Sequence, residues 1–346
     1  GTVLVKFILL EVITINDRGC EMTGKIKGIG AYVPHNAIDN RELERFVETS
    51  DEWILERTGI RRRHIAVEDT TVSMAVKASK GALEDAGMEA GNLDLIIVST
   101  ISPMRIMPCT ACEVQKEIGA ANAACFDLSA ACSGFLMAYI TACAYIESGM
   151  FRHILIVGSE CLSNLTDWSD RGTCILFGDG AGAAVVTAAE GRTFAPAVYS
   201  DGNQGSALTL QSRHDRSPFN EGGKDYGSRE YYMQMDGQAV FKFAVRKVPQ
   251  VIENVLSENR MKKGDIKYYI LHQANKRIVE AAAKRLEEPV SKFPMNMQEY
   301  GNTSSASIPI LLYEMKERGQ LRSGDRIVLA GFGGGLTWGA VIVTWK

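Results

Sequence analysis

One internal repeat constrains the fold of this chain more than any other feature of its sequence. ALEDAGMEAGNLDLIIVST at residues 82–100 resembles VLSENRMKKGDIKYYILHQ at residues 255–273 without a gap. HILIVGSE at 153–160 matches RIVLAGFG at 326–333 at the same separation along the chain, and FGDGAGAAVV at 177–186 resembles FGGG…GAVIV at 332–343 at a slightly shorter separation. Self-similarity at a fixed period indicates a duplicated structural unit. The sequence therefore predicts two copies of one α/β unit.

Each copy contains apolar runs of strand length, such as DLIIVST and HILIVGS in the first and YYILHQ and RIVLAGF in the second. Near-continuous apolar runs are typical of strands that are covered on both faces, and helical patterns such as SGFLMAYITACAYIESG lie between them. We therefore expect an α/β protein whose two duplicated halves, residues 22–190 and 191–346, form a five-layer αβαβα body. In α/β folds, active sites gather at the carboxyl ends of strands and at the helix starts beyond them.

Composition narrows the class of protein. The chain has 346 residues, of which 46% are hydrophobic and 23% are charged, and its formal net charge is -3. These values are typical of a soluble globular protein and give no electrostatic reason to expect a nucleic-acid partner. No window reaches the roughly 18 to 20 apolar residues that cross a bilayer. We expect a cytoplasmic protein without a membrane partner.

The segment 1–21 precedes Met22. Its apolar stretch VLVKFILLEVI is interrupted by Lys6 and Glu11, and no typical cleavage site follows it. These features argue against a signal peptide. We predict that residues 1–21 are a leader or start-site extension outside the fold.

The eight cysteines are scattered through helix-like and strand-like segments. This pattern is typical of reduced thiols in a cytosolic protein rather than a disulfide scaffold. Cys109 and Cys112 form a C-x-x-C pair, but a zinc site needs a second pair or histidines nearby, and a thioredoxin-like site needs a different context. No metal site is therefore predicted.

Cys132 stands in DLSAACSGF (127–135), among small residues and at the start of a predicted helix over 133–147. An exposed thiol at a helix start is activated by the partial positive charge there. Small neighbours leave room for a carbonyl carbon, and a backbone N–H at the helix start can bind the resulting oxyanion. A small buried hydrophobe is the alternative interpretation, and it describes most cysteines. The residues alone leave both interpretations open.

The second copy contributes three further candidates at equivalent places. His272 ends a strand in LHQAN (271–275), and Asn302 precedes a helix in YGNTSSASIP (300–309). GFGGGLTWG (331–339) is a glycine-rich turn whose N–H groups could bind an oxyanion. The alternative for His272 is a structural histidine whose hydrogen bonds are all formed within the protein. The alternatives for Asn302 and for the glycine-rich turn are a helix cap and a tight hairpin.

At this point the sequence resembles the β-ketoacyl-acyl carrier protein synthase III family of thiolase-fold condensing enzymes. The resemblance covers residues 22–346 and rests on six ordered motifs. They are TSDEWILERTGIRRR, DLSAACSGF, DRGTCILFGDGAGA, LHQANKRI, YGNTSSASIP and GFGGGLTWG.

The resemblance implies a two-step condensation that initiates fatty acid synthesis. Cys132 would take the acyl group of an acyl-CoA primer, most simply acetyl-CoA, and malonyl-acyl carrier protein would then lose CO2 and attack the acyl-enzyme. His272 and Asn302 would donate hydrogen bonds to the enolate oxygen, and the N–H groups of Cys132 and Gly334 would form the oxyanion hole. No cofactor is implied, because acyl-CoA is a substrate.

The resemblance also assigns residues to the two large substrates. In the family, the adenine of CoA lies between a tryptophan and an arginine, here Trp53 and Arg57. The implied CoA and pantetheine contacts are Thr49, Trp53, Arg57, Arg171, Gly237 and Asn275. The implied docking residues for the acidic carrier protein are Lys242, Arg277, Lys284 and Arg285.

Two departures from the family pattern leave the primer open. Met107 stands where the family more often has phenylalanine at the floor of the acyl pocket, supplied across a homodimer interface, and methionine is more flexible. Residues 211–232 form a long polar insertion near the expected tunnel mouth. Branched and longer primers remain compatible with this sequence.

Three alternative functions remain. A related condensing enzyme could prime a polyketide or use another acyl-CoA. An acyl-thioester hydrolase could use Cys132 and His272, although Asn302 and the tunnel motifs favour condensation. An inactive partner subunit is disfavoured, because all three expected catalytic residues are present.

Overall fold

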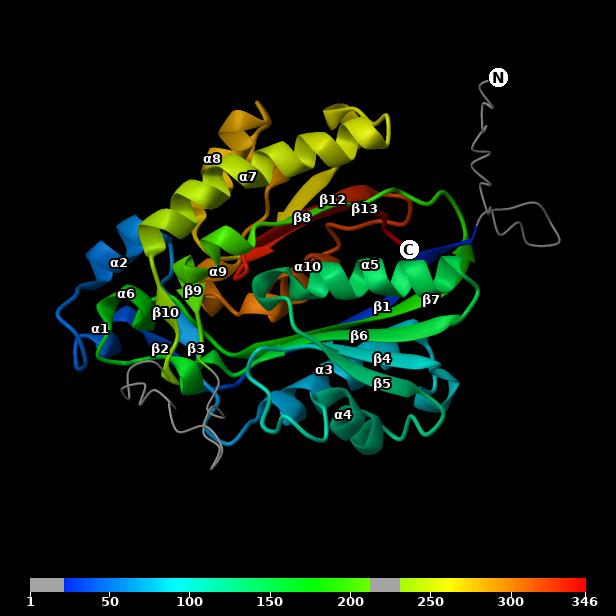
Figure 1. Ribbon diagram of the computed structural model, residues 1–346, viewed down its shortest axis with the longest axis horizontal. Coiled ribbons are helices and arrows are strands. Elements are labelled where there is room, and N and C mark those ends of the chain that lie inside the picture. The colour runs from blue at the N-terminus through cyan, green and yellow to red at the C-terminus, as the bar shows by residue number, and fades with distance from the viewer. Residues whose placement is uncertain (1–21, 212–230) are drawn as a thin grey trace, which may run out of the picture.

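Two stacked sheets form the frame of the molecule in the computed structural model, which describes residues 22–211 and 231–346 (Figure 1). The expected leader at 1–21 and all but the ends of the polar insertion lie outside the described residues. The five-stranded sheet has the order β1–β7–β6–β4–β5, and the four-stranded sheet has the order β11–β12–β13–β8. Their strands are β1 (Met22–Tyr32), β4 (Leu95–Ser99), β5 (Ala124–Leu128), β6 (His153–Glu160), β7 (Gly180–Glu190), β8 (Ala197–Ser200), β11 (Tyr268–Leu271), β12 (Arg326–Gly333) and β13 (Thr337–Thr344).

The two sheets share one topology. In the first, β4 pairs in parallel with β5 and β6, and β7 runs antiparallel to β6 and β1. In the second, β11 pairs in parallel with β12, and β13 runs antiparallel to β12 and β8. All strands of the first sheet precede residue 191, and all strands of the second follow it. The division of the chain at that point stays a prediction.

Helices complete five layers, which confirms the expected αβαβα body (Figure 1). Helices α3 (Thr71–Ala86) and α4 (Thr110–Ile118) cover the outer face of the first sheet. Helices α5 (Gly134–Glu147) and α10 (Ser307–Glu317) lie between the sheets, where their apolar residues contact both. Helices α7 (Gly237–Glu258) and α8 (Lys276–Arg285) cover the outer face of the second sheet.

The duplication holds residue by residue. Strands β6 and β12 begin at positions 153 and 326, and helices α5 and α10 begin at positions 134 and 307, which is the same separation. A short 3-10 turn precedes each of these helices, Ala131–Ser133 in the first half and Ser304–Ala306 in the second. Both turns open with a non-glycine residue in the left-handed region, Ala131 at φ 45° and Ser304 at φ 48°. The repeat predicted from the sequence is therefore confirmed.

Shorter elements gather at one end of the body, on the left in Figure 1. They are β2 (Ala37–Asp39), α1 (Asn40–Leu43), α2 (Asp51–Thr58), β3 (Arg62–His64), α6 (Arg171–Cys174), β9 (Leu208–Thr209), β10 (Gln234–Met235) and α9 (Met297–Tyr300).

The backbones of helix α3 and strand β1 come very close together, because the residues at their contact are small. A Cβ atom at Gly30 would collide with the backbone of Ala78 and Ala82 on the helix. Both alanines are completely buried. The sheet and the helix therefore approach each other as closely as their main chains allow.

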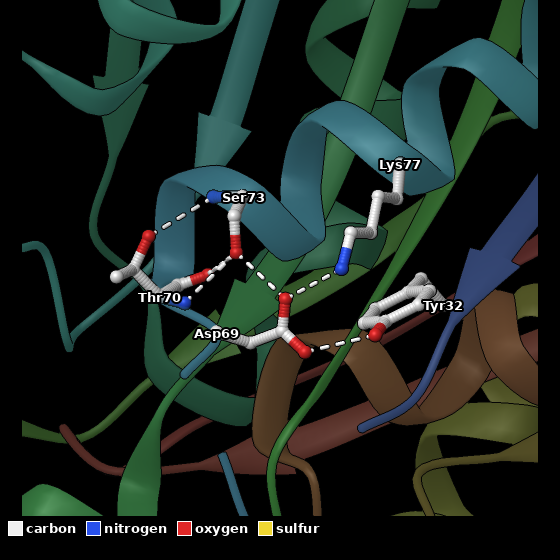
Figure 2. A network of polar contacts seen from close by, with 5 residues as sticks. All are labelled: Tyr32, Asp69, Thr70, Ser73 and Lys77. Atoms are coloured by element: carbon white, nitrogen blue, oxygen red, sulfur yellow. Dashed lines mark hydrogen bonds and ion pairs between the residues drawn. The ribbon is translucent and has the colours of Figure 1, made fainter. Parts of the chain in front are cut away.

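A polar network holds the beginning of α3 in place (Figure 2). Thr70 and Ser73 form a reciprocal capping box. The Asp69 carboxylate accepts hydrogen bonds from Tyr32 at 2.8 Å, Ser73 at 2.9 Å and Lys77 at 2.6 Å. Burial pushes the pKa of Asp69 upward, but the hydrogen bonds from Lys77, Tyr32 and Ser73 outweigh it and hold the pKa below its usual value. Asp69 is therefore ionised at neutral pH and ties α3 to the end of β1.

The cysteines within the described ranges are all free thiols. Cys109 and Cys112 lie at the beginning of α4 with their sulfur atoms 3.4 Å apart. Among the helices that the structure describes, none is long and apolar enough to cross a bilayer.

The Asp69 network yields a stability prediction. Replacing Asp69 with Asn should lower the free energy of unfolding by about 1.5–3 kcal/mol, the usual contribution of hydrogen bonds to a mostly buried charged group. The measurement is urea unfolding at pH 7. Glu117→Gln is the control, because Glu117 pairs with Lys116 through side chains that are 54% and 83% exposed, and such pairs contribute less than about 1 kcal/mol. Equal losses in the two variants would contradict this assignment.

Candidate active site

Cys132 lies between β5 and α5, in the first of the two 3-10 turns. Only 8% of its surface is exposed, so the thiol is buried, a point that the sequence left open. The small residues around Cys132 let the second half of the chain cover it. Gly333 shows how closely: a Cβ atom there would lie 2.8 Å from Cys132 Cβ and 3.0 Å from its backbone nitrogen. The glycine-rich turn can therefore reach the cysteine only without a side chain at residue 333.

His272 follows the end of β11, and Asn302 follows α9. Both are buried, at 1% and 7% exposure. The Asn302 side-chain oxygen accepts the backbone N–H of Ser304 at 2.9 Å. The residue before the 3-10 turn is Thr303, so Asn302 is not the helix cap considered from the sequence, and its hydrogen bond instead holds the chain that enters the turn. This hydrogen bond uses only the oxygen, so the amide NH2 remains available to another partner.

One cavity of about 1570 Å³ joins these residues. Cys132, His272, Asn302 and Gly334 all line it, although they come from both halves of the chain. The structure therefore brings together the four residues expected to perform the chemistry. Much of the wall is apolar and consists of Ile101, Leu162, Phe177, Leu208, Met233 and Phe332.

Burial sets the charge of the two titratable groups. The pKa of the Cys132 thiol is raised to about 12, mainly by desolvation and also by the Glu160 carboxylate, whereas the neighbouring Ser304 hydroxyl acts to lower it. Desolvation also lowers the pKa of His272 to about 3. At neutral pH the resting site therefore contains a neutral thiol and a neutral imidazole.

Ser307 orients the His272 ring. Its Oγ lies 2.7 Å from His272 Nδ1 and accepts the backbone N–H of Gln273 at 3.3 Å. The hydroxyl can donate to Nδ1 while it accepts this N–H, an arrangement that suits the ring tautomer with its proton on Nε2. The sequence analysis missed Ser307 and Ser304, because single serines in YGNTSSASIP carry no separate signal. The repeat could have selected Ser304, which is the counterpart of Ala131 in the second copy.

Exposed and partly exposed residues line the other end of the cavity. Trp53, Arg57, Gly237 and Asn275 are among them. The Asn275 amide donates to the Arg57 carbonyl at 3.0 Å, while its oxygen caps α8. These four expected CoA contacts therefore share the cavity with Cys132.

Two other expected CoA contacts do not line the cavity. Thr49 lies just before α2. Arg171 stacks on Trp53, with its guanidinium carbon 4.7 Å from the ring centre, while Arg57 stacks on the same ring at 4.8 Å. The Trp53 ring, which we expect to contact adenine, is therefore already covered by two guanidinium groups.

Met107 and the four expected docking residues differ in where they lie relative to the cavity. Met107 is 86% exposed and does not line the cavity of its own chain, although its neighbours Arg105 and Ile106 do. Lys242 and Arg277 line the exposed end of the cavity. Lys284 and Arg285 lie at the far end of α8, away from the cavity.

Comparison with known proteins identifies the family. A family model described as 3-oxoacyl-[acyl-carrier-protein] synthase III matches residues 126–202, and the model of its C-terminal part matches residues 256–345. The β-ketoacyl-[acyl-carrier-protein] synthase III of Clostridium perfringens is 47% identical over 321 residues, which are 92% of this chain and 98% of that protein.

Solved structures agree with the sequence relatives. The crystal structure of 3-oxoacyl-[acyl-carrier-protein] synthase III from Aquifex aeolicus matches with a TM-score of 0.86 at 43% identity, over 93% of this chain and 100% of that one. The priming β-ketosynthase of the R1128 polyketide pathway matches with a TM-score of 0.87 at 34% identity, over 94% and 96%. The chain belongs to the β-ketoacyl-[acyl-carrier-protein] synthase III family, the thiolase-fold condensing enzymes that initiate fatty acid synthesis.

Proposed function

We propose that this acyltransferase loads an acyl-CoA primer, with acetyl-CoA preferred, onto Cys132 and condenses it with malonyl-acyl carrier protein. His272 and Asn302 are the other catalytic residues. The observation that carries the proposal is the shared cavity, which contains these three side chains at its buried end and Trp53 and Arg57 at its exposed end. The reaction needs no metal or further cofactor, because acyl-CoA is a substrate.

The first half-reaction moves the acyl group between two sulfur atoms. Cys132 Sγ bonds to the thioester carbon, the bond from that carbon to the CoA sulfur breaks, and the cysteine proton ends on CoA. Negative charge develops on the thioester oxygen during the attack. The backbone N–H groups of Cys132 and Gly334 stabilise that charge, and such donors act most strongly where water is excluded.

The second half-reaction builds the new carbon–carbon bond. Malonyl-acyl carrier protein loses CO2, and negative charge develops on its thioester oxygen. The Nε2–H of His272 and the NH2 of Asn302 donate hydrogen bonds to that oxygen. The His272 ring performs this role in its neutral form, because burial makes a charged imidazolium energetically unfavourable at this position. The carbanion attacks the Cys132 thioester and yields a β-ketoacyl chain two carbons longer.

The CoA end of the cavity must open before adenine binds. A base between Trp53 and Arg57 needs a separation of about 7 Å, two contacts of roughly 3.5 Å each. The Arg57 guanidinium lies 4.8 Å from the Trp53 ring centre, so Arg57 has to move aside. Arg171 also stacks on this ring, at 4.7 Å. Thr49, Gly237 and Asn275 complete the proposed CoA and pantetheine contacts.

We assign the remaining partners from surface features. The carrier protein is acidic, and four basic residues on α7 and α8 provide a complementary face. They are Lys242, Arg277, Lys284 and Arg285. The exposed Met107 stands in the loop between β4 and α4, and apolar exposure of that degree supports burial by a second copy of the chain. The proposed enzyme is thus a cytoplasmic homodimer in which Met107 shapes the partner's acyl pocket.

The likeness to the priming β-ketosynthase of a polyketide pathway favours one second candidate. In that function the same site would load a different acyl-CoA for polyketide synthesis. Intact mass after incubation with a mixture of acyl-CoAs distinguishes the two, because the adduct mass reports the preferred primer.

The nucleophile is tested by Cys132→Ser. The variant should form no acyl adduct with any acyl-CoA, because an alcohol has a much higher pKa than a thiol and remains protonated at pH 7. Intact mass spectrometry measures the adduct, and Cys161→Ser, which changes another buried cysteine, is the control. Native-rate condensation by Cys132→Ser would remove Cys132 from the mechanism.

Asn302 separates the two half-reactions. Both Asn302→Ala and Asn302→Asp should slow malonyl decarboxylation by about a hundredfold to a thousandfold, since each lacks the NH2 donor. Self-acylation should stay within a few-fold of the wild type. Asp keeps an oxygen for the Ser304 N–H, so it controls for loss of that hydrogen bond. Normal decarboxylation in the Asp variant would show that Asn302 acts only through the turn.

The neutrality of His272 predicts how stability depends on pH. Its pKa is about 3 in the folded protein against 6.5 ordinarily, so between these values the unfolded chain binds a proton that the native protein does not. The stabilisation is complete above pH 6.5 and is lost progressively as the pH falls toward 3. From pH 6.5 to 5 the wild type should lose about 1.5–2 kcal/mol more than His272→Asn, at about 1.4 kcal/mol per unit. Urea unfolding at both pH values measures the difference, and identical losses would indicate a charged native ring.

A further inference from the structure

Ser304 occupies a conformation that few side chains adopt. Its φ of 48° lies in the left-handed region, where glycine would be less strained. Its counterpart in the first half, Ala131, has nearly the same φ. The backbone shape is therefore a property of both turns, whereas the hydroxyl belongs to the second half alone. Unfavourable backbone conformations that persist are concentrated at functional sites.

The Ser304 hydroxyl is buried without a regular partner. Ser304 is 1% exposed and lines the same cavity as Cys132. Within residues 22–211 and 231–346, its Oγ makes no hydrogen bond of good geometry. Its backbone N–H is held by Asn302, which fixes the turn. A buried hydroxyl without a hydrogen-bond partner destabilises the resting enzyme. An acceptor that appears only during the reaction would remove this cost and would thereby be stabilised in the transition state.

We propose that Ser304 is a further catalytic residue, whose hydroxyl donates a hydrogen bond to the Cys132 sulfur as negative charge develops there. The proposal rests on the proposed role of Cys132 as the nucleophile. In the resting enzyme the neutral thiol is a weak acceptor, and the hydroxyl stays unsatisfied. The charged sulfur is a strong acceptor, so the bond forms when the reaction needs it.

The charges around Cys132 explain why such a donor matters. Burial raises the pKa of the thiol, and the Glu160 carboxylate at the end of β6 raises it further. His272, which follows β11, is neutral. In the part of the chain that the structure describes, the groups that lower the pKa of Cys132 are Ser304 and the backbone N–H of Cys132 itself. Of these two groups, only Ser304 acts through a side chain.

Ser304 keeps its proton throughout this step. The sulfur–hydrogen bond of Cys132 breaks, the bond from sulfur to the acyl carbon forms, and the bond from that carbon to the CoA sulfur breaks. The cysteine proton leaves with CoA. Ser304 therefore changes the rate without appearing in the stoichiometry.

The test measures how readily Cys132 forms a thiolate, and it does not depend on the condensation reaction. Iodoacetamide alkylation of Cys132 is followed by peptide mass spectrometry from pH 6 to 10, and the partly exposed Cys109 in the same samples is the internal reference. In Ser304→Ala, alkylation of Cys132 at a given pH should fall about tenfold or more, the usual effect of losing a hydrogen bond to a charged group. The rise of its rate should move to higher pH, while Cys109 stays unchanged.

Two further variants separate the hydroxyl from the turn. Ser304→Gly removes the hydroxyl and the strain together, and it should lose reactivity as much as Ser304→Ala does. Ser305→Ala changes the adjacent serine, whose hydroxyl bonds Ser99 and Glu160 instead, and alkylation of Cys132 should stay within about twofold. Unchanged alkylation in both Ser304 variants, with folding intact by circular dichroism, overturns the proposal. Failure of the nucleophile assignment would instead appear as condensation by Cys132→Ser.

Discussion

A single buried carboxylate joins the two halves of the molecule beside the site. Glu160, at the end of β6, accepts hydrogen bonds from Ser102 at 2.7 Å, Ser305 at 2.9 Å and the Ile101 backbone at 3.1 Å. Ser305 belongs to the turn of the second half, whereas the other two donors begin the loop that leads to Met107. Burial raises the pKa of Glu160 although these donors oppose it. Loss of one donor would leave an uncompensated polar group in the centre of the body, so the halves are held in one relative position.

The site exists only because that position is fixed. The nucleophile belongs to the first half, and the imidazole and the amide belong to the second. Another hydrogen bond between the halves runs from Thr337 to Ser133 at 3.0 Å and holds the glycine-rich turn against Cys132. Two short turns with matching backbone thus meet at the contact between the halves. Cys132 and His272 are both buried at this contact, which is why the thiol and the imidazole are uncharged and why a few hydrogen-bond donors have large effects.

The two sheets and their covering helices could be predicted from the sequence, because both the buried elements and the internal repeat produce recurring patterns. Buried strands and the helices between them produce long apolar runs, and their order recurs at a constant separation. The three proposed catalytic residues were found because the repeat and the motifs pointed to strand ends and helix starts. The burial of Cys132 was not found, since small neighbours are compatible with an open thiol and with a closely covered one. Gly333 decides between them, and its approach depends on how the halves pack.

Side-chain directions were also beyond the sequence. Whether the Ser304 hydroxyl faces the cavity depends on one φ angle, and a run of serines contains no information on that angle. Ser307 is a similar case, because its partner His272 is distant in the chain. The stacking of Arg57 and Arg171 on Trp53 brings together α2 and α6, which are far apart in the chain, so no local pattern predicts it.

That stack has a consequence for the order of events in the proposed reaction. In the proposed CoA site, Arg57 acts as an internal competitor: every CoA thioester must displace its guanidinium from Trp53, and free CoA must hold that guanidinium away to remain bound. An exposed cation–π contact contributes about 0.5–1 kcal/mol, so affinity falls by roughly twofold to fivefold regardless of the acyl group. The contact would therefore not discriminate between primers. It would instead help to eject spent CoA, which has to leave before the carrier protein can insert its own pantetheine arm.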